Sequence, residues 1–270
     1  GLADEPQLLA RQLEGIPVMV GVDRSASGRW ACTTFSADTV VMDDGFQHRR
    51  LARDCDIVLV DARMPLGGWP LLPRGPMREP LQSLARAHVV MVTHAEERFE
   101  MVGALTERLR AYANEATFVT ARHEPESLVD STTGQQQDLQ CLEGKRVGLV
   151  SSIGDPQGFE AMVRRLNAQV LWHRAFPDHH RYKRVDIAQL LTLAHDTHLE
   201  LLVTTQKDWV RLRHVMVGSR GQVDGTVSGC GGQYWNAMPP VWVLGVRMRC
   251  ISGEEELHAR LARLCHRHDQ

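Results

Sequence analysis

The sequence lacks any long apolar run and any strong excess of charge. Its longest apolar runs, such as residues 57–60 and 89–92, have the length of a strand, far below the roughly 18 to 20 apolar residues of a membrane-spanning helix. The 270 residues carry a formal net charge of −2, which argues against non-specific coating of nucleic acid. No secretory signal opens the chain, since Asp4-Glu5-Pro6 lies where an apolar segment would be required.

Two kinds of short motif are also missing. The six cysteines form no C-x-x-C pair and have no metal-type spacing, so we expect reduced thiols in a cytoplasmic protein. No G-x-x-x-x-G-K-[ST] motif, the loop that holds nucleotide phosphates in P-loop enzymes, occurs anywhere in the 270 residues. The composition is otherwise that of an ordinary globular protein, with 43% hydrophobic and 24% charged residues.

Short apolar runs alternate with amphipathic stretches through most of the chain. The apolar runs predict strands at residues 18–22, 39–42, 56–60, 89–93, 117–120, 147–151, 170–173, 201–205 and 241–246. The amphipathic stretches predict helices at residues 7–14, 80–87, 97–113, 156–167, 185–196 and 254–265. Residues 25–36 contain Gly28, Thr33 and Thr34, which have low helix propensity, so this segment is a poor candidate for a helix. Continuous Val/Ile/Leu strands between helices are typical of an α/β fold with mainly parallel sheets.

A polar stretch divides the chain into two parts. Residues 126–143 contain a Ser-Thr-Thr-Gly sequence and several glutamines, and we expect a linker there. The sequence therefore predicts two α/β/α domains of Rossmann-like layering, at residues 1–125 and 144–270.

The strongest local feature is the apolar run 40–42 that leads directly into Asp43-Asp44-Gly45 and then Gln47-His48. In open α/β sheets, ligands bind at the carboxyl ends of strands, and two acids there can hold Mg²⁺ directly and through water. Gln47 and His48 would face the same crevice. The alternative is a strand that ends in an ordinary Asp-Gly turn.

Three further segments carry charged groups beside predicted strand ends. Arg78 and Glu79 project from the Pro- and Gly-rich residues 71–80, and the guanidinium fork suits phosphate oxygens. In Asp178-His179, a His fixed by a carboxylate is a natural proton acceptor near neutral pH. Lys207 follows a strand and could reach an anionic substrate. A rigid connector, a polar turn and a charged helix start are the respective alternatives.

The Asp4-Glu5-Pro6 sequence at the start of the chain also has two interpretations. Asp at a helix cap, followed by Glu and Pro in the first turn, is most simply a helix start. Capping and catalysis are compatible, because a helix N-terminus is also where phosphates bind.

Taken in this order, these pieces resemble the tetraacyldisaccharide 4'-kinase family, the lipid A 4'-kinases of bacteria with an outer membrane. The matching residues are Asp4-Glu5-Pro6, Arg24, Asp43-Asp44-Gly45-Phe46-Gln47-His48, Arg50-Leu51-Ala52-Arg53-Asp54, Leu72-Pro73, Gly75-Pro76, Arg78-Glu79, Ile153-Gly154, Pro156, Asp178-His179, Thr205 and Lys207-Asp208. The string from Asp43 to Asp54 is the most specific part.

The resemblance implies a fold of the P-loop kinase type and transfer of the ATP γ-phosphoryl group to the 4'-hydroxyl of a lipid A disaccharide 1-phosphate. It implies ATP and Mg²⁺ as cofactors, with Asp43 and Asp44 as the metal-binding acids and Glu5 in support. Asp4 would be the catalytic base, paired with His179 beside Asp178. The residues expected near the nucleotide or phosphates are Gln47, His48, Arg78, Glu79 and Lys207; for Arg78 this follows from its chemistry.

The resemblance also identifies a departure. The family carries its Walker A loop and a membrane-contacting helix upstream of Asp-Glu-Pro, whereas three residues precede that motif here and the first is Gly rather than Met. We therefore expect a first domain truncated at its N-terminus and a chain that is inactive alone for want of the P-loop. We expect the complete protein to lie peripherally on the cytoplasmic side of the inner membrane, through the missing segment. We expect no nucleic acid partner and no obligate protein partner.

Two alternatives remain open at this point. One is a non-enzymatic remnant that binds the disaccharide lipid. The other is a metal-dependent phosphohydrolase that uses Asp43, Asp44 and His179 without a P-loop.

Overall fold

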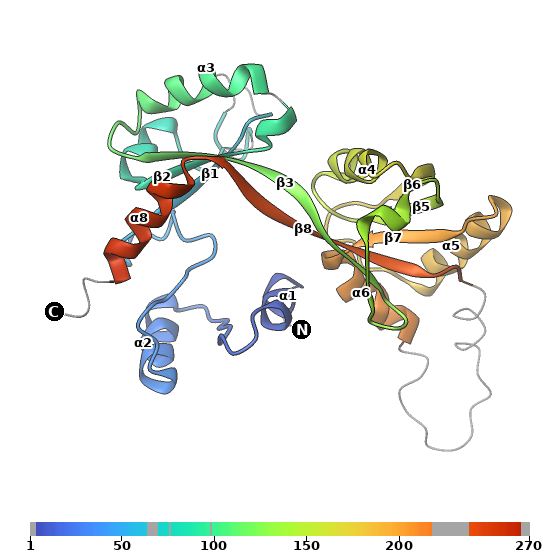
Figure 1. Ribbon diagram of the computed structural model, residues 1–270. Helices are drawn as coiled ribbons and strands as arrows, with labels where there is room; N and C mark the ends of the chain where they lie inside the picture. The colour runs from blue at the N-terminus through green and yellow to red at the C-terminus, as the bar shows by residue number, and fades with distance from the viewer. Residues whose placement is uncertain (1–3, 64–69, 76, 98, 218–237, 266–270) are drawn as a thin grey trace. The chain divides into compact units, whose positions relative to one another are not determined.

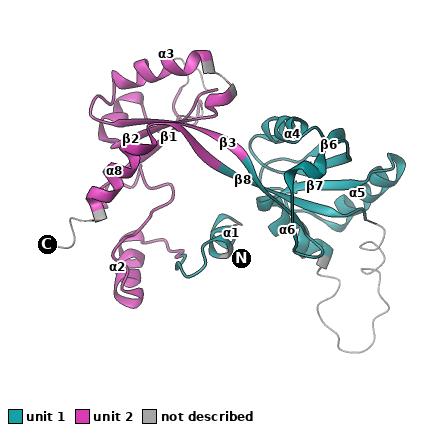
Figure 2. Cartoon of the chain, in the orientation of Figure 1, with its two compact units in different colours: residues 1–18, 125–247 teal, residues 19–124, 248–270 magenta. Residues whose placement is uncertain are grey.

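A computed structural model describes residues 4–63, 70–75, 77–97, 99–217 and 238–265 of the chain (Figure 1). The chain divides into two compact units (Figure 2). Unit 1 comprises residues 1–18 and 125–247, and unit 2 comprises residues 19–124 and 248–270.

Four strands of unit 1 lie parallel in the order β6-β5-β7-β8. They are β5 (Arg146–Ser151), β6 (Gln169–Ala175), β7 (Leu201–Thr205) and the first part of β8 (Val241–Ser252). The chain goes from β5 to its neighbour β6 and then crosses to β7 on the other side of β5. The carboxyl ends of β5 and β7 therefore form a topological switch point, the place where open α/β sheets bind ligands.

Helices cover both faces of the unit 1 sheet. The helices of this unit are α1 (Asp4–Gln12), α4 (Pro156–Arg165), α5 (Arg184–Asp196) and α6 (Gln206–Val217), of which α4, α5 and α6 pack on the sheet. On one face, Met162 of α4 packs with Leu149 of β5. On the other face, Leu190 of α5 and Leu212 of α6 pack with Leu202 of β7. Helix α1 packs against α6, which places the N-terminal segment with this unit.

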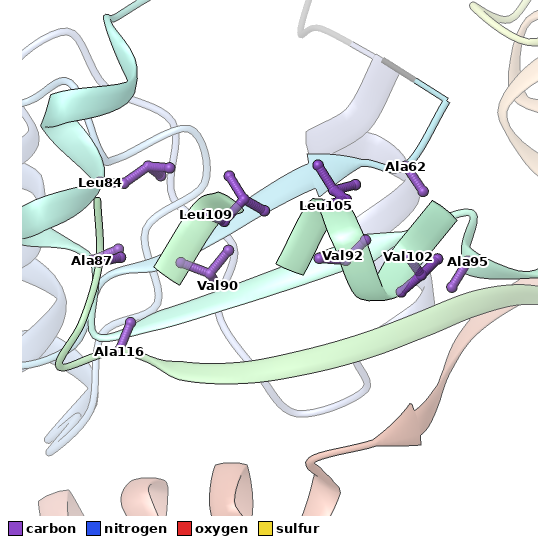
Figure 3. Packing of buried hydrophobic residues seen from close by; sticks show 11 residues of the cluster. Ala62, Leu84, Ala87, Val90, Val92, Ala95, Val102, Leu105, Leu109 and Ala116 are labelled. Carbon is purple, nitrogen blue, oxygen red and sulfur yellow. The ribbon is translucent and has the colours of Figure 1, made fainter. Parts of the chain in front are cut away.

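Unit 2 repeats this layering around three parallel strands. Its parallel strands are β1 (Ile57–Asp61), β2 (Val89–Thr93) and the first part of β3 (Thr117–Asp130). Its helices are α2 (Arg24–Phe35), α3 (Phe99–Arg110) and α8 (Glu254–Cys265), with short 3₁₀ helices η1 (Leu81–Arg86) and η2 (Ala95–Glu97). Figure 3 shows Leu105 and Leu109 of α3 close to Val90 and Val92 of β2. Leu257 of α8 covers the opposite face.

The predicted linker over residues 126–143 instead contains regular structure. It holds the end of β3, the short strand β4 (Gln136–Gln137) that pairs with β3, and the single-turn helix η3 (Leu139–Leu142). The unit boundaries also differ from the predicted division at 1–125 and 144–270, because residues 1–18 group with unit 1 and residues 248–270 with unit 2. The cause is tertiary packing of α1 on α6 and of α8 on the unit 2 sheet, which composition along the chain does not reveal.

Two predicted strands, at residues 18–22 and 39–42, are not strands in the structure. A strand needs a hydrogen-bonded neighbour, and no strand in the described part of the chain pairs with either segment. Their apolar side chains are accordingly exposed, with Val41 at 92% of its full accessible surface. Conversely, α2 forms where a poor helix was predicted. The side chain of Asp23 accepts a hydrogen bond from the amide of Ala26 at 2.9 Å and so caps this helix.

The other predicted strands and helices match observed elements within a few residues, except that β3 and β8 are longer than predicted. None of the helices in the described ranges combines the length and apolar character needed to span a bilayer.

Candidate functional site

A buried carboxylate organises the carboxyl ends of the strands in unit 1. Asp208, at the start of α6, is fully buried. Its Oδ1 accepts hydrogen bonds from the amide of Ser152 at 3.0 Å, from the Ser152 hydroxyl and from the Tyr182 hydroxyl at 3.0 Å. Its Oδ2 accepts a bond from the Thr205 hydroxyl at 2.7 Å. Because a buried carboxylate is stable only when its oxygens are satisfied, this network fixes the residues that follow β5 and β7.

Arg211, one turn further along α6, connects this buried network to the surface. Its Nη1 donates to the Ser152 hydroxyl at 2.8 Å and lies 3.8 Å from Oδ1 of Asp208. Its Nη2 lies 3.2 Å from Nδ1 of His179. The guanidinium fork therefore has one nitrogen in the buried network and one at the exposed imidazole.

The exposed part of the site brings together four charged or titratable residues from three segments. Lys207 lies with Nζ 3.1 Å from Oε1 of Glu5 and 3.4 Å from Oδ1 of Asp178. The Nε2 atom of His179 lies 3.9 Å from Oε1 of Glu5 and 3.8 Å from Oδ2 of Asp178. We call Glu5, Asp178, His179 and Lys207 the acceptor cluster. It combines carboxylates that can accept a proton with a cation that can attract an anionic substrate.

The backbone holds His179 in a conformation that few non-glycine residues adopt. Its φ is 59°, in the left-handed region. Its amide donates to Oδ1 of Asp178 at 2.9 Å and to the carbonyl of Ser152 at 3.3 Å. The first bond is local to the turn after β6, and the second ties that turn to the end of β5.

Two groups of this site have shifted pKa values. Burial acts to raise the pKa of Glu5. Hydrogen bonds from its own backbone amide and from Lys207, with the nearby charges of Lys207 and His179, lower the pKa by more than burial raises it. The net pKa of Glu5 lies below its ordinary value, so this carboxylate is ionised at neutral pH. Burial, and then the charge of Asp208, raises the pKa of the Tyr182 hydroxyl, which stays a protonated donor.

A second set of predicted site residues lies in unit 2. Asp43 and Asp44 lie in a turn, both exposed, and Asp44 has a φ of 49°. Arg78 forms an ion pair with the carboxylate of Asp44, and Arg24 donates to the carbonyl of Asp43. The structure thus brings the Asp-Asp motif together with Arg78 from the Pro-rich segment, although the two are 34 residues apart in sequence.

Arg86 organises the rest of this set. Its Nη2 lies 2.7 Å from Oε2 of Glu79, and its guanidinium carbon lies 4.4 Å from the centre of the Phe46 ring. Burial acts to raise the pKa of Glu79, but hydrogen bonds from Arg86 and Ser83, with the charges of Arg86 and Arg49, outweigh it and lower the pKa overall. Gln47 is exposed and His48 half-buried, on the turn after Phe46. The carbonyl of His48 accepts from Arg53 at 2.7 Å.

The predicted site residues therefore form two sets, one in each unit. Unit 1 brings Glu5, Asp178, His179 and Lys207 together, and unit 2 brings Asp44 and Arg78 together. The predicted metal ligands divide between the units, with Glu5 in unit 1 and the two aspartates in unit 2. Asp4 is the first residue of α1, and its side chain lies outside the described part of the chain.

Sequence reasoning assigned no role to the residues that support these side chains, although Asp208 belongs to the strings that carry the family resemblance. A buried hydrogen-bond network of Ser152, Tyr182, Asp208 and Arg211 contacts the acceptor cluster through His179. Arg86 donates a hydrogen bond to Glu79. A signal existed for Asp208, which follows a strand with the pattern of a helix start. None existed for Arg211, whose partners lie 32 and 59 residues away in sequence.

Comparison with known proteins gives a consistent result. The family model described as LpxK, tetraacyldisaccharide-1-P 4'-kinase, matches residues 2–266. A tetraacyldisaccharide 4'-kinase of Anaeromyxobacter dehalogenans (strain 2CP-C) is 42% identical over 221 residues, which are 81% of this chain and 58% of that protein. A tetraacyldisaccharide 4'-kinase of Syntrophus aciditrophicus is 40% identical over 216 residues, which are 77% of this chain and 58% of that protein.

A solved structure shares the fold. The crystal structure of LpxK from Aquifex aeolicus in complex with ATP aligns with a TM-score of 0.63 at 24% sequence identity. The alignment covers 97% of this chain and 68% of that chain. The chain thus spans less than two thirds of the length of the two relatives that it matches in sequence.

Proposed function

The chain belongs to the tetraacyldisaccharide-1-P 4'-kinase family, and we propose that it forms part of an enzyme that phosphorylates a lipid A disaccharide. In this proposal the γ-phosphoryl group of ATP passes to the 4'-hydroxyl of the disaccharide 1-phosphate. The match of the family model over residues 2–266 carries the proposal. The acceptor cluster supplies the chemistry that an alcohol acceptor requires.

The acceptor hydroxyl must lose its proton as its oxygen attacks the γ-phosphorus. The bond between that phosphorus and the β,γ-bridging oxygen breaks, and ADP leaves. We assign the proton to a carboxylate of α1, with Asp4 as the catalytic base and His179 and Asp178 beside it. Lys207, whose Nζ lies between Glu5 and Asp178, offers a positive charge to the substrate.

The nucleotide end of the reaction is assigned to unit 2. Among the described residues, no group of three or more His, Cys, Asp or Glu side chains is arranged to hold a metal ion alone. The carboxylates of Asp43 and Asp44 nevertheless fit Mg²⁺, which proteins bind through one or two carboxylates while water and phosphates complete its shell. When bound, Mg²⁺ would neutralise charge on the transferring phosphates.

The remaining nucleotide contacts are assigned by chemistry. Arg78 offers a guanidinium to phosphate oxygens, in competition with its present partner Asp44. Gln47 and His48 follow the Asp-Asp motif, and Glu79 lies next to Arg78 in the Pro-rich segment. We assign these three residues to the surroundings of the nucleotide phosphates.

The triphosphate needs a further binding element. Because no G-x-x-x-x-G-K-[ST] motif occurs in these 270 residues, we propose that they do not transfer phosphate by themselves. We also propose that the complete enzyme works peripherally at the cytoplasmic face of the inner membrane, because its acceptor is a lipid.

The test is an assay of phosphate transfer from γ-³²P-ATP to tetraacyldisaccharide 1-phosphate in mixed micelles with Mg²⁺. It compares the product of the complete reading frame that contains these residues, its Asp43→Asn and Asp44→Asn variants, and the 270-residue chain. We expect labelled lipid with the complete product, a large loss in both variants, and none with the 270-residue chain.

The other outcomes are equally informative. Absence of transfer by a folded complete product would contradict the kinase proposal and favour a lipid-binding remnant. Release of phosphate from the sugar phosphate without ATP would favour the phosphohydrolase. Transfer by the 270-residue chain would keep the kinase proposal and overturn the need for a further phosphate-binding element.

A further inference from the structure

We propose that Arg211 is a positioning residue that fixes His179 in the tautomer with its proton on Nε2. Neutral imidazole carries one proton, on either Nδ1 or Nε2, and the nitrogen without it can only accept a hydrogen bond. A guanidinium is always charged under these conditions and has donors only. The contact of 3.2 Å between Nη2 of Arg211 and Nδ1 of His179 is therefore a hydrogen bond only when Nδ1 accepts.

The position of Arg211 is set independently of His179. Its side chain is 8% exposed, and its other terminal nitrogen, Nη1, donates to the Ser152 hydroxyl at 2.8 Å. Nη1 also lies 3.8 Å from the fully buried carboxylate of Asp208. Because the two terminal nitrogens of the fork are rigidly connected, the buried contacts of Nη1 aim Nη2 at the imidazole.

The consequence concerns the other side of the ring. With Nδ1 occupied by Arg211, the neutral ring presents an N–H at Nε2. That atom faces the carboxylates of Glu5 and Asp178, at 3.9 and 3.8 Å. A ring in this tautomer presents a hydrogen-bond donor toward α1, where a carboxylate that comes within about 3 Å can accept it, and Nε2 does not itself take a proton.

This inference deepens the proposed function and, in its catalytic part, rests on it. If the chain serves phosphate transfer to an alcohol, the proton of that alcohol goes to a carboxylate of α1 that His179 holds in place. The tautomer itself is a property of the folded chain and is measured without substrate, so it can fail or hold independently of the kinase assay.

The experiment records long-range ¹H–¹⁵N spectra of the histidine rings in the 270-residue chain, at a pH where His179 is neutral. His179→Gln identifies the signals. The two ring nitrogens have distinct shifts when protonated and when not, so the spectrum reports the tautomer ratio. We expect His179 of the wild-type chain to show a pyrrole-like Nε2 and a pyridine-like Nδ1.

Two variants test the part played by Arg211. Arg211→Met removes the donor. We expect the ratio of the Nε2–H tautomer of His179 to its Nδ1–H tautomer to fall about tenfold, because the loss of one hydrogen bond from a charged donor changes an equilibrium by roughly that factor. Arg211→Lys keeps the charge, but its single ammonium does not span both Ser152 and His179, so we expect an intermediate ratio. Tyr182→Phe is the matched control, because it removes a donor to Asp208 and leaves the Arg211–His179 contact in place.

The control separates positioning from stability. We expect Tyr182→Phe to lower the stability of unit 1 without changing the tautomer ratio of His179. A wild-type spectrum with Nδ1 protonated would overturn the proposal. So would an unchanged ratio in either Arg211 variant that keeps the dispersed amide spectrum of the folded chain.

Discussion

Replacement of Asp208 by Asn tests how far one buried carboxylate supports the candidate site. The side chain is fully buried and accepts hydrogen bonds from the amide and hydroxyl of Ser152, from Tyr182 and from Thr205. Asn has the same shape but no charge, and its amide group places two donors where the carboxylate accepts. An amide nitrogen in the place of Oδ1 would face the donor-only amide of Ser152, and one in the place of Oδ2 would oblige the Thr205 hydroxyl to turn and accept; in both cases Arg211 loses its buried counter-charge.

The expected cost follows from these contacts. Hydrogen bonds to a charged group contribute about 1.5–3 kcal/mol each, and removal of one partner of a buried ion pair costs about 3–5 kcal/mol. Because the contacts share one group, they do not add, and we expect Asp208→Asn to lower the free energy of unfolding of unit 1 by about 3–5 kcal/mol. Tyr182→Phe removes a single donor from the same carboxylate and should cost about 1.5–3 kcal/mol, the contribution of one hydrogen bond to a charged group.

The assay is urea unfolding followed by far-UV circular dichroism, together with amide hydrogen exchange at β5 and β7. Hydrogen exchange assigns the loss to unit 1, since a chain of two units need not unfold in one step. The reasoning would be refuted if Asp208→Asn cost no more than Tyr182→Phe, because the carboxylate would then not be the centre of the network.

Further predictions concern packing and pH. Gly148→Ala should destabilise the chain by about 1–3 kcal/mol in thermal unfolding, because a Cβ at Gly148 would lie 2.4 Å from the Trp172 ring. Gly103→Ala, in the open middle of α3, should stabilise it by about 0.5–1 kcal/mol, and equal effects of the two changes would contradict this packing. The pKa of Glu79 is lowered in the folded chain despite burial, through Arg86, so its contribution to stability is present above the unfolded pKa and is lost as the pH falls through the folded pKa. Arg86→Met should therefore reduce the loss of stability between about pH 5 and pH 3, as urea midpoints at the two pH values would show.

Much of the fold follows from local patterns in the sequence. The buried strands β2 and β7 are continuous apolar runs that pack on both faces, and this pattern predicted them at their observed bounds. The same pattern failed at residues 18–22 and 39–42, because an apolar run becomes a strand only where a neighbour pairs with it. For α2, the Asp23 cap provides a helix start that offsets poor helix propensity.

The exposed charged side chains of the candidate site could be predicted from the sequence, but the buried residues that support them could not. Side chains such as His179 and Lys207 stand at strand ends in chemically suggestive strings, so sequence reasoning found them. Arg211 and Tyr182 act through partners that only the folded chain brings close, so sequence reasoning assigned neither of them a role. The affiliation of α1 with unit 1 likewise depends on packing between residues that are nearly 200 positions apart, as the Gln12–Gln206 bond of 2.8 Å at a separation of 194 residues shows.

The central claim, that these residues serve an ATP-dependent kinase for the 4'-hydroxyl, is tested most directly by the position of the new phosphate. The complete reading frame product is incubated with ATP, Mg²⁺ and tetraacyldisaccharide 1-phosphate, and the lipid is analysed by two-dimensional ¹H–³¹P NMR. The account predicts a second phosphomonoester whose phosphorus couples to the proton on carbon 4' of the distal glucosamine. A phosphate at any other carbon, or loss of the 1-phosphate in place of a gain, would contradict it.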